Sequence, residues 1–244
     1  MSDDGQDVHR PLCHGSAHRA RHADHSEEIP VMDQAFWEAH YGSADAIWSG
    51  RPNPHLVSEI GVGDGSARGR ALDVGAGEGA DAIWLAQHGW QIDAVDISAV
   101  ALARGRARAD SLGPNVTERI TWTQADLLTH PPEPAAYDLV SMHYMQLPPA
   151  DRDRVFPACI DAVAPGGALL VVAHHAKDMQ TRGVSPSFAA MFYTAEQVAE
   201  SLDDSWTVQV RETRRREGAD PDGQTVTFYD TVLLARRGDT DTAG

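Results

Sequence analysis

The sequence contains little cysteine, few basic residues and no long apolar segment. Among 244 residues there are 2 cysteines, and 20 Lys and Arg stand against 36 Asp and Glu, for a formal net charge of −16. Cys13 and Cys159 lie far apart, so no disulfide framework is implied. The acidic excess disfavours sequence-independent binding to nucleic acid phosphates. The longest apolar run is around 167–173, so we expect neither a membrane span nor a signal peptide, and a cytoplasmic location.

The remaining composition fits one globular domain, with a hydrophobic fraction of 42% that is adequate for a core. We predict four parts: a disordered, His-rich tail at 1–30, an N-terminal cap segment at 31–60, a ligand-binding domain at 61–237 and a flexible C-terminus at 238–244.

The tail offers one metal hypothesis. His14, His18, His22 and His25 would line one face of a helix, with Cys13 beside them. Two arginines interrupt that face and nothing else fixes such a helix. We therefore predict no metal site.

The segment 71–79, Ala-Leu-Asp-Val-Gly-Ala-Gly-Glu-Gly, precedes an apolar helical run. This order is typical of a buried strand, a tight glycine turn and a helix N-terminus, where backbone N–H groups approach a ligand closely and negative charge is favoured. It predicts a nucleotide ligand with an acidic or dipolar tail. Gly75, Gly77 and Ala80 also satisfy the loose dinucleotide fingerprint, so a nicotinamide-dependent oxidoreductase is an alternative.

Acidic residues end or follow several predicted strands. Asp73 precedes the turn, Asp96 ends the strand 91–96 and Asp126 ends the run 119–126. Strands and helices alternate, which favours a doubly wound α/β fold with a mostly parallel sheet. Ligands bind such sheets at the carboxyl ends of the strands, so Asp96 is placed to bind a ribose diol.

The end of the chain departs from this alternation. Thr194 and Gln197 are typical of a capping box that opens a helix to about Leu202. Two strands at 206–210 and 225–234 follow with no helix between them. Since their connection at 218–223 is turn-like, we expect an antiparallel hairpin at the sheet edge. Dinucleotide-binding domains do not usually end in this way.

Taken together, these motifs resemble the class I S-adenosylmethionine-dependent methyltransferases. The D-x-G-x-G-x-G turn, the acids after strands two and three, and Pro165-Gly166-Gly167 before strand five have counterparts there, across roughly 36–236. The resemblance implies seven strands with a C-terminal antiparallel hairpin, and S-adenosylmethionine as cofactor. It implies that the cofactor is bound by Trp48, Arg51, Asp73, Gly75, Ala76, Gly77, Asp96, Ile97, Ala125, Asp126, Leu127 and His143.

The segment around Trp48 and Arg51 is the candidate lid of the site. An arginine presents a planar fork that matches a carboxylate. In similar small-molecule methyltransferases, including the tellurite-resistance type, an N-terminal segment folds over the cofactor. We expect Arg51 to bind the methionine carboxylate and Trp48 to form one wall of the site. The alternative is a surface turn packed by one tryptophan.

His143 and Tyr144 follow strand four and are the candidate catalytic residues. His143 could act as a base if the acceptor is a hydroxyl or a protonated amine, although a packed, hydrogen-bonded histidine is about equally expected. His174 and His175 end strand five and could line the acceptor pocket. The segment 141–148 lacks the Asn-Pro-Pro-Tyr and Pro-Cys motifs of nucleic acid methyltransferases. We therefore predict methyl transfer to a small-molecule O, N, S or chalcogen nucleophile, with a non-catalytic cofactor binder as a further alternative.

Overall fold

The computed structural model describes residues 31–61, 68–177, 186–219 and 225–239. The strands are β1 Arg70–Val74, β2 Gln91–Asp96, β3 Ile120–Gln124, β4 Tyr137–His143, β5 Val163–His174, β6 Trp206–Ala219 and β7 Thr225–Arg237. The helices are α1 Gln34–Gly42, α2 Pro54–Ile60, α3 Ala80–Gln87, α4 Ala99–Ser111, α5 Pro114–Thr117, α6 Pro149–Asp161, α8 Pro186–Ala189 and α9 Ala195–Ala199.

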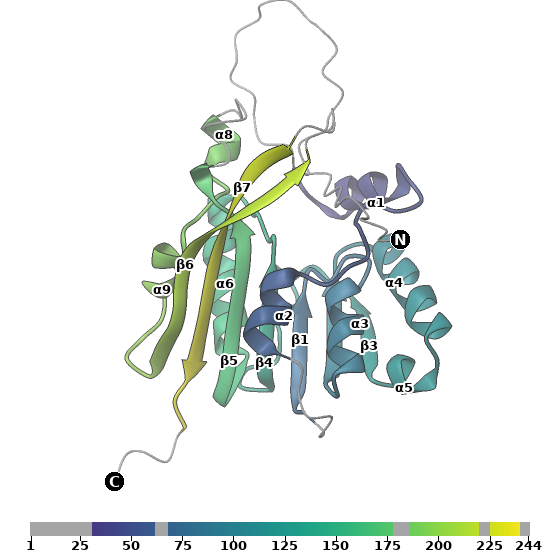
Figure 1. Cartoon of the computed structure of the whole chain (residues 1–244), viewed down its shortest axis with the longest axis horizontal. Coiled ribbons are helices and arrows are strands. Elements are labelled where there is room, and N and C mark those ends of the chain that lie inside the picture. The colour runs from purple at the N-terminus through teal and green to yellow at the C-terminus, as the bar shows by residue number, and fades with distance from the viewer. Residues whose placement is uncertain (1–30, 62–67, 178–185, 220–224, 240–244) are drawn as a thin grey trace, which may run out of the picture.

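All seven strands form a single sheet with helices on both of its faces (Figure 1). The strand order is β3-β2-β1-β4-β5-β7-β6. The pairs from β3 to β5 are parallel, whereas β7 pairs antiparallel with both β5 and β6. The predicted seven-stranded sheet with its C-terminal antiparallel hairpin is therefore confirmed. The order reverses between β1 and β4, and such a switch point opens a crevice at the carboxyl ends of the strands.

Side chains alternate between two hydrophobic clusters, one on each face of the sheet. On β5, Leu169 and Val171 belong to the cluster that contains α6 and α9 residues, whereas Leu170 and Val172 belong to the cluster that contains α3 residues. This is the period of two that a pleated strand imposes. Because both faces of β5 are covered, its sequence is continuously apolar rather than alternating.

Two helix starts carry capping bonds, and the one at Thr194 was predicted. The Ser98 hydroxyl accepts the Ala101 N–H at the start of α4. Thr194 and Gln197 form a reciprocal capping box at the start of α9, which ends at Ala199 rather than at the expected Leu202.

Two features of the fold differ from the sequence expectation. Helix α6 was not anticipated, because Pro148 and Pro149 begin it and Pro157 interrupts its pattern. Strand β6 continues to Ala219, where a turn was expected, so the hairpin is longer than predicted.

The segment 31–60 divides into two parts. In α2, Leu56 is fully buried in the cluster that contains α3 residues, so this helix covers a face of the sheet. Helix α1 lies against α4 near the carboxyl ends of the strands (Figure 1). The predicted tail at 1–30 and its metal hypothesis lie outside the described residues. Among the described helices, none has the length and apolar character needed to cross a membrane.

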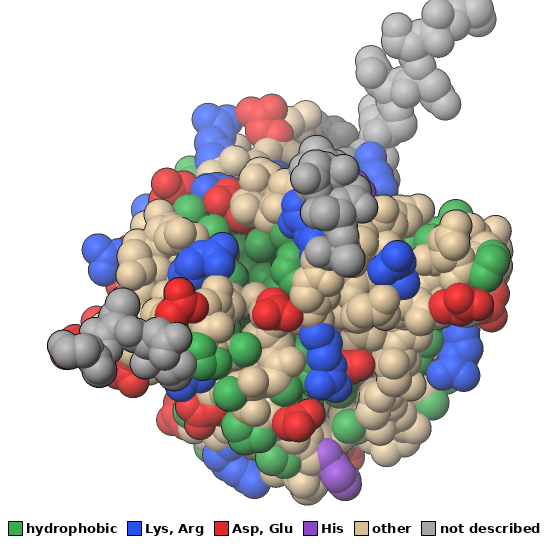
Figure 2. All heavy atoms as spheres, turned by 90° about the horizontal axis from the view of Figure 1, so that it is seen from below, with side chains coloured by type: hydrophobic (Ala, Val, Ile, Leu, Met, Phe, Trp, Pro, Cys, Tyr) green, Lys and Arg blue, Asp and Glu red, His purple; other side chains and the backbone are tan. Residues whose placement is uncertain are grey.

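Figure 2 shows the end of the molecule away from this edge, where the parallel strands begin. Acidic and basic side chains are interspersed across that face, with hydrophobic side chains between them. Such a mixed surface gives a phosphate backbone no continuous basic track on this side.

Candidate active site

A cavity of about 540 Å³ opens at the switch point, bounded by the carboxyl ends of the central strands and the segment 31–53. Its size is within the usual range for small-ligand sites. Every residue predicted to contact the cofactor, from Trp48 to His143, lines this one cavity, as do Tyr144 and His174. His175 is not among the lining residues: its ring accepts the Lys177 N–H instead. Of the segment 181–192, which we expected to contribute to the acceptor pocket, residues 181–185 lie outside the described residues.

The glycine turn after β1 forms the floor of the cavity. Gly75, Gly77 and Gly79 all have positive φ angles, of 67°, 52° and 74°. At Gly77 a Cβ atom would also come within 2.9 Å of the Tyr41 hydroxyl. A side chain at position 77 is therefore unfavourable for two reasons, the strained backbone conformation and the steric contact with Tyr41.

Asp96 ties this turn to the end of β2. It is 7% exposed. One carboxylate oxygen accepts the Gly77 N–H at 2.8 Å and the other accepts the Ser98 N–H at 2.8 Å. Burial raises the pKa of Asp96, and the N–H donors from Ser98 and Gly77 oppose that shift without cancelling it. Each oxygen keeps a second lone pair, so the group can still accept hydroxyl donors from a ligand in the cavity.

Asp73 is a buried acid whose carboxylate is only partly satisfied by hydrogen bonds. The residue is 2% exposed, and its Oδ2 has no hydrogen-bond partner among the described residues. Burial, with a further contribution from the charge of Asp81, raises the pKa of Asp73 to about 7. A buried polar atom without a partner is costly unless a ligand satisfies it. A cationic ligand group, such as an ammonium, fits this position.

Glu78 lies inside the glycine turn and anchors the N-terminal segment. It accepts the backbone N–H groups of Ile47 and Trp48, the latter at 3.0 Å. It also pairs with Arg104 of α4 at 2.8 Å, and Arg104 donates to the Tyr41 and Ala44 carbonyls. The segment that covers the cavity is thereby bonded directly to the turn that forms its floor.

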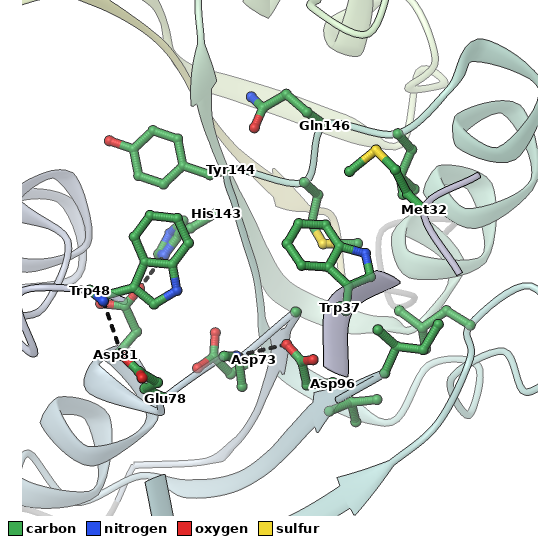
Figure 3. A pocket seen from close by; sticks show the side chains of 18 of the residues that line it. Met32, Trp37, Trp48, Asp73, Glu78, Asp81, Asp96, His143, Tyr144 and Gln146 are labelled. Atoms are coloured by element: carbon green, nitrogen blue, oxygen red, sulfur yellow. Dashed lines mark hydrogen bonds and ion pairs between the residues drawn. The ribbon is translucent and has the colours of Figure 1, made fainter. Parts of the chain in front are cut away.

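Aromatic rings from that segment enclose the site. Figure 3 shows the indoles of Trp37 and Trp48 and the carboxylates of Asp73 and Asp96 around one cavity. Trp48 Nε1 donates to the Tyr41 hydroxyl at 3.2 Å, which fixes its ring. Arg51 also lines the cavity, and its backbone N–H donates to the Ser49 hydroxyl.

The loop after β3 provides the neighbouring wall. The Ala125 N–H donates to the Asp96 carbonyl at 3.0 Å, and the Asp126 carboxylate accepts the Leu128 N–H at 2.9 Å. Together with Ile97 and Leu127 these half-buried residues form a short slot beside Asp96. A flat, partly apolar ring with polar edges fits such a slot.

Comparison with known proteins agrees with this geometry. Residues 71–167, which include the turn and strands β1 to β4, match a family model described as a methyltransferase domain. Residues 71–167 are a methyltransferase domain, and the fold is that of the class I S-adenosylmethionine-dependent methyltransferases.

Two curated relatives and one solved structure illustrate the likeness. A ubiquinone biosynthesis O-methyltransferase of Azoarcus sp. (strain BH72) is 31% identical over 117 residues, covering 48% of this chain and 49% of that protein. A ribosomal RNA small subunit methyltransferase C of Alcanivorax borkumensis is 35% identical over 71 residues, covering 26% of this chain and 22% of that protein. The chain thus matches half or less of the length of these relatives.

The solved structure is N-methyltransferase NodS of Bradyrhizobium japonicum WM9 in complex with S-adenosyl-L-homocysteine. It has a TM-score of 0.59 at 18% identity, covering 84% of this chain and 98% of that one. At this identity the likeness concerns the fold. The resemblance to the tellurite-resistance type is minor among such matches.

Within the methyltransferase domain, His143 has protein partners at both ring nitrogens. Its Nδ1 is 2.7 Å from the Asp81 carboxylate (Figure 3). Its Nε2 is 3.2 Å from the Ser141 hydroxyl. Since a carboxylate only accepts, Nδ1 carries a proton, and in the neutral ring Nε2 accepts from Ser141. A base role would require that second bond to break, so the geometry favours the packed, hydrogen-bonded histidine over the free base.

Tyr144 also turns its reactive group away from the cavity. Its ring packs against that of His174 in a tilted arrangement with centroids 4.5 Å apart, and its hydroxyl is buried. Burial, with a further contribution from Asp230, raises the pKa of Tyr144 well above its usual value, so the phenol stays neutral. Tyr144 lines the cavity while its oxygen is buried.

Several polar residues in or around the site were not predicted from the sequence, among them Glu78, Asp81, Arg104, Arg216 and Asp230. Two of them carried a visible signal. Glu78 is an acid between two glycines, and Asp230 is the one acid of strand β7, directly after Phe228 and Tyr229. Asp81 and Arg104 lie on helices whose polar positions are ordinary, so only their distant partners distinguish them.

Proposed function

We propose that this chain transfers a methyl group from S-adenosylmethionine to a nucleophilic atom of a small molecule. The observation that carries the proposal is that the carboxylates of Asp73 and Asp96 line the same cavity at the switch point. One buried carboxylate has an oxygen without a partner, and the other holds the glycine turn while facing the same cavity. This arrangement suits a ligand with an ammonium group at one end and a ribose diol beside it.

Each predicted contact has a chemical counterpart in the cofactor. Asp73 would hold the ammonium group, Asp96 the ribose hydroxyls, and the slot at 125–127 the adenine. Arg51 would hold the methionine carboxylate through its guanidinium fork. The cofactor supplies an electrophilic methyl group on a sulfonium. The task left to the protein is to align the nucleophile and exclude water, and such positioning can provide much of the acceleration.

Exclusion of water is the role we assign to the segment around Trp48. Its backbone is bonded to Glu78 and its ring to Tyr41, so the indole is held over the cavity. Removing water strengthens the electrostatic interactions inside the site.

A small acceptor is favoured over nucleic acid for two reasons. The cavity of about 540 Å³ is enclosed by aromatic residues of the covering segment, and the chain carries a net charge of −16. RNA is included as a test acceptor because one relative is a ribosomal RNA methyltransferase, although that relative matches only 26% of this chain. The oxidoreductase alternative is not supported by the methyltransferase comparisons.

The test is a screen in which S-adenosylhomocysteine formation is followed for panels of small hydroxyl, amine, thiol and selenol compounds, with total RNA as a separate arm. We expect turnover with a small acceptor, loss of turnover in Asp96→Ala, and no turnover with RNA. Binding of S-adenosylhomocysteine without turnover in any arm would instead support a non-catalytic binder. Absence of cofactor binding would contradict both.

A further inference from the structure

We propose that the cavity wall formed by β5, β6 and β7 is a binding subsite for an anionic group of the methyl acceptor, a carboxylate, with Arg216 and His174 as its recognition residues. This inference rests on the proposed methyltransferase function and specifies the substrate class of the same site.

The centre of this subsite is a buried carboxylate surrounded by basic groups. Asp230 of β7 is fully buried. Its carboxylate lies 3.1 Å from His55 Nε2 of α2, 3.0 Å from Arg216 Nε of β6 and 3.9 Å from His174 Nδ1 of β5. A buried charge of this kind must be paired to be tolerated. Three basic residues from three elements are therefore gathered around one acid.

Asp230 remains ionised in this setting. Burial raises its pKa, but hydrogen bonds from His55 and Arg216 lower it by more, so the pKa of Asp230 lies below its ordinary value. An ionised Asp230 holds the guanidinium and the imidazoles in fixed positions. It acts as a positioning residue, because Arg216 and His174 line the cavity and Asp230 does not.

The two recognition residues are also held by aromatic contacts. The Arg216 guanidinium lies over the Phe228 ring, 4.5 Å from its centroid, and the His174 ring packs against that of Tyr144 at a tilt. Tyr144 adopts a φ angle of 55°, a left-handed conformation that a bulky residue rarely takes. Backbone strain of this kind persists where surrounding structure enforces it, and such positions cluster at ligand sites.

The distribution of charge points to an anion. Asp73, Asp81 and Asp96 lie around the glycine turn and α3. Their carboxylates suit a cationic group of a ligand. On the β5–β6–β7 wall, the charge of Arg216 balances that of Asp230, and the His174 imidazole adds a further hydrogen-bonding group that lines the cavity. Arginine forks match carboxylates geometrically, and a desolvated site strengthens that contact.

The probe is a matched set of aromatic compounds: benzoate, benzamide and benzylammonium. Each is titrated by calorimetry into the full chain saturated with S-adenosylhomocysteine. We expect benzoate to bind at least about tenfold more tightly than benzamide, and benzylammonium to bind most weakly.

Arg216→Gln should reduce the affinity for benzoate to that for benzamide. Since this change leaves Asp230 without its cation, Arg216→Lys is the companion variant that retains a positive charge, and it should show an intermediate preference. The matched control is Arg214→Gln, on the same strand. Arg214 pairs with Glu59 and Glu212 and does not line the cavity, so the preference for benzoate should be unchanged.

Three results would overturn the proposal: equal binding of benzoate and benzamide, no binding of any probe, or an unaltered preference in a folded Arg216 variant. Binding of S-adenosylhomocysteine is measured first in the same protein. Its failure contradicts the proposed function, whereas its success without a preference for benzoate contradicts only the anionic subsite.

Discussion

Asp96 and Gly77 are 19 residues apart, and the carboxylate of Asp96 accepts the Gly77 backbone N–H at 2.8 Å. One side chain at the end of β2 thus fixes the conformation of the turn after β1. The same carboxylate faces the cavity, so turn geometry and ligand contact depend on a single group.

Replacing this group should weaken cofactor binding. We expect Asp96→Ala to cost about 1–3 kcal/mol in binding of S-adenosylhomocysteine, because charge-assisted hydrogen bonds to the ribose are lost. Calorimetry measures the change. Asp93→Ala is the control on the same strand, since Asp93 binds Arg70 and Tyr137 instead of lining the cavity. Equal affinities for the unmodified protein and Asp96→Ala would contradict the ribose assignment.

The glycine turn should not tolerate a side chain at Gly77. Gly77→Val should abolish measurable binding of S-adenosylhomocysteine, because φ is 52° and the new Cβ would meet the Tyr41 hydroxyl. Gly42→Val is the matched control, since no atom lies within 4 Å of a Cβ there. Retained binding of S-adenosylhomocysteine by a folded Gly77→Val variant would contradict the assignment of the glycine turn to the cofactor site.

Cofactor affinity should depend on pH through Asp73. Its pKa is raised to about 7, first by burial and then by Asp81. The folded state therefore holds a proton that the unfolded state releases near its ordinary pKa of about 4, and the contribution of Asp73 to stability falls as pH rises between these values. The deprotonated form is the one that attracts an ammonium group.

Affinity for S-adenosylhomocysteine should accordingly rise between about pH 6 and pH 8, and Asp73→Asn should bind more weakly with little pH dependence. Adenosine lacks the ammonium group, so its affinity should not follow this rise. Parallel pH profiles for the two ligands would show that Asp73 does not contact the amine.

Arg51 is predicted to clamp the methionine carboxylate. Arg51→Lys should lose much of the affinity for S-adenosylhomocysteine although it keeps the charge, because a point ammonium cannot reproduce a two-pronged contact, and Arg51→Ala should lose more. Adenosine has no carboxylate and should bind both variants as it binds the unmodified protein. Equal losses for the two ligands would indicate that Arg51 supports the covering segment instead.

The His-rich tail should be dispensable for cofactor binding. Deleting residues 1–28 removes no described element, so calorimetry and thermal unfolding should give nearly unchanged affinity and Tm. A rise in Tm with zinc or nickel in the full chain and not in the truncated one would support the metal hypothesis.

The sequence alone predicted the alternation of strands and helices along the central part of the chain and the place of the candidate site at the strand ends. Period-two and helical apolar patterns, the alternating glycines and the caps at Ser98 and Thr194 act over a few residues, so they can be read locally. Because a doubly wound sheet brings strand ends together, Asp73, Asp96 and Asp126 could be assigned to one cavity in advance. Helix α6 was missed because its prolines obscure a pattern that tertiary packing stabilises.

Only the tertiary structure decided which partners the polar side chains have. His143 was identified from its place after β4, but its bond to Asp81, 62 residues away, and its contact with Ser141 turn both ring nitrogens toward protein. His55 meets Asp230 across 175 residues of sequence. Such pairs depend on how α3 packs beside β4 and α2 beside β7, and no short-range pattern in the sequence encodes that packing. The physical reason is that hydrophobic periodicity specifies which face of an element is buried, whereas hydrogen bonds require the angle and register that only the assembled sheet provides.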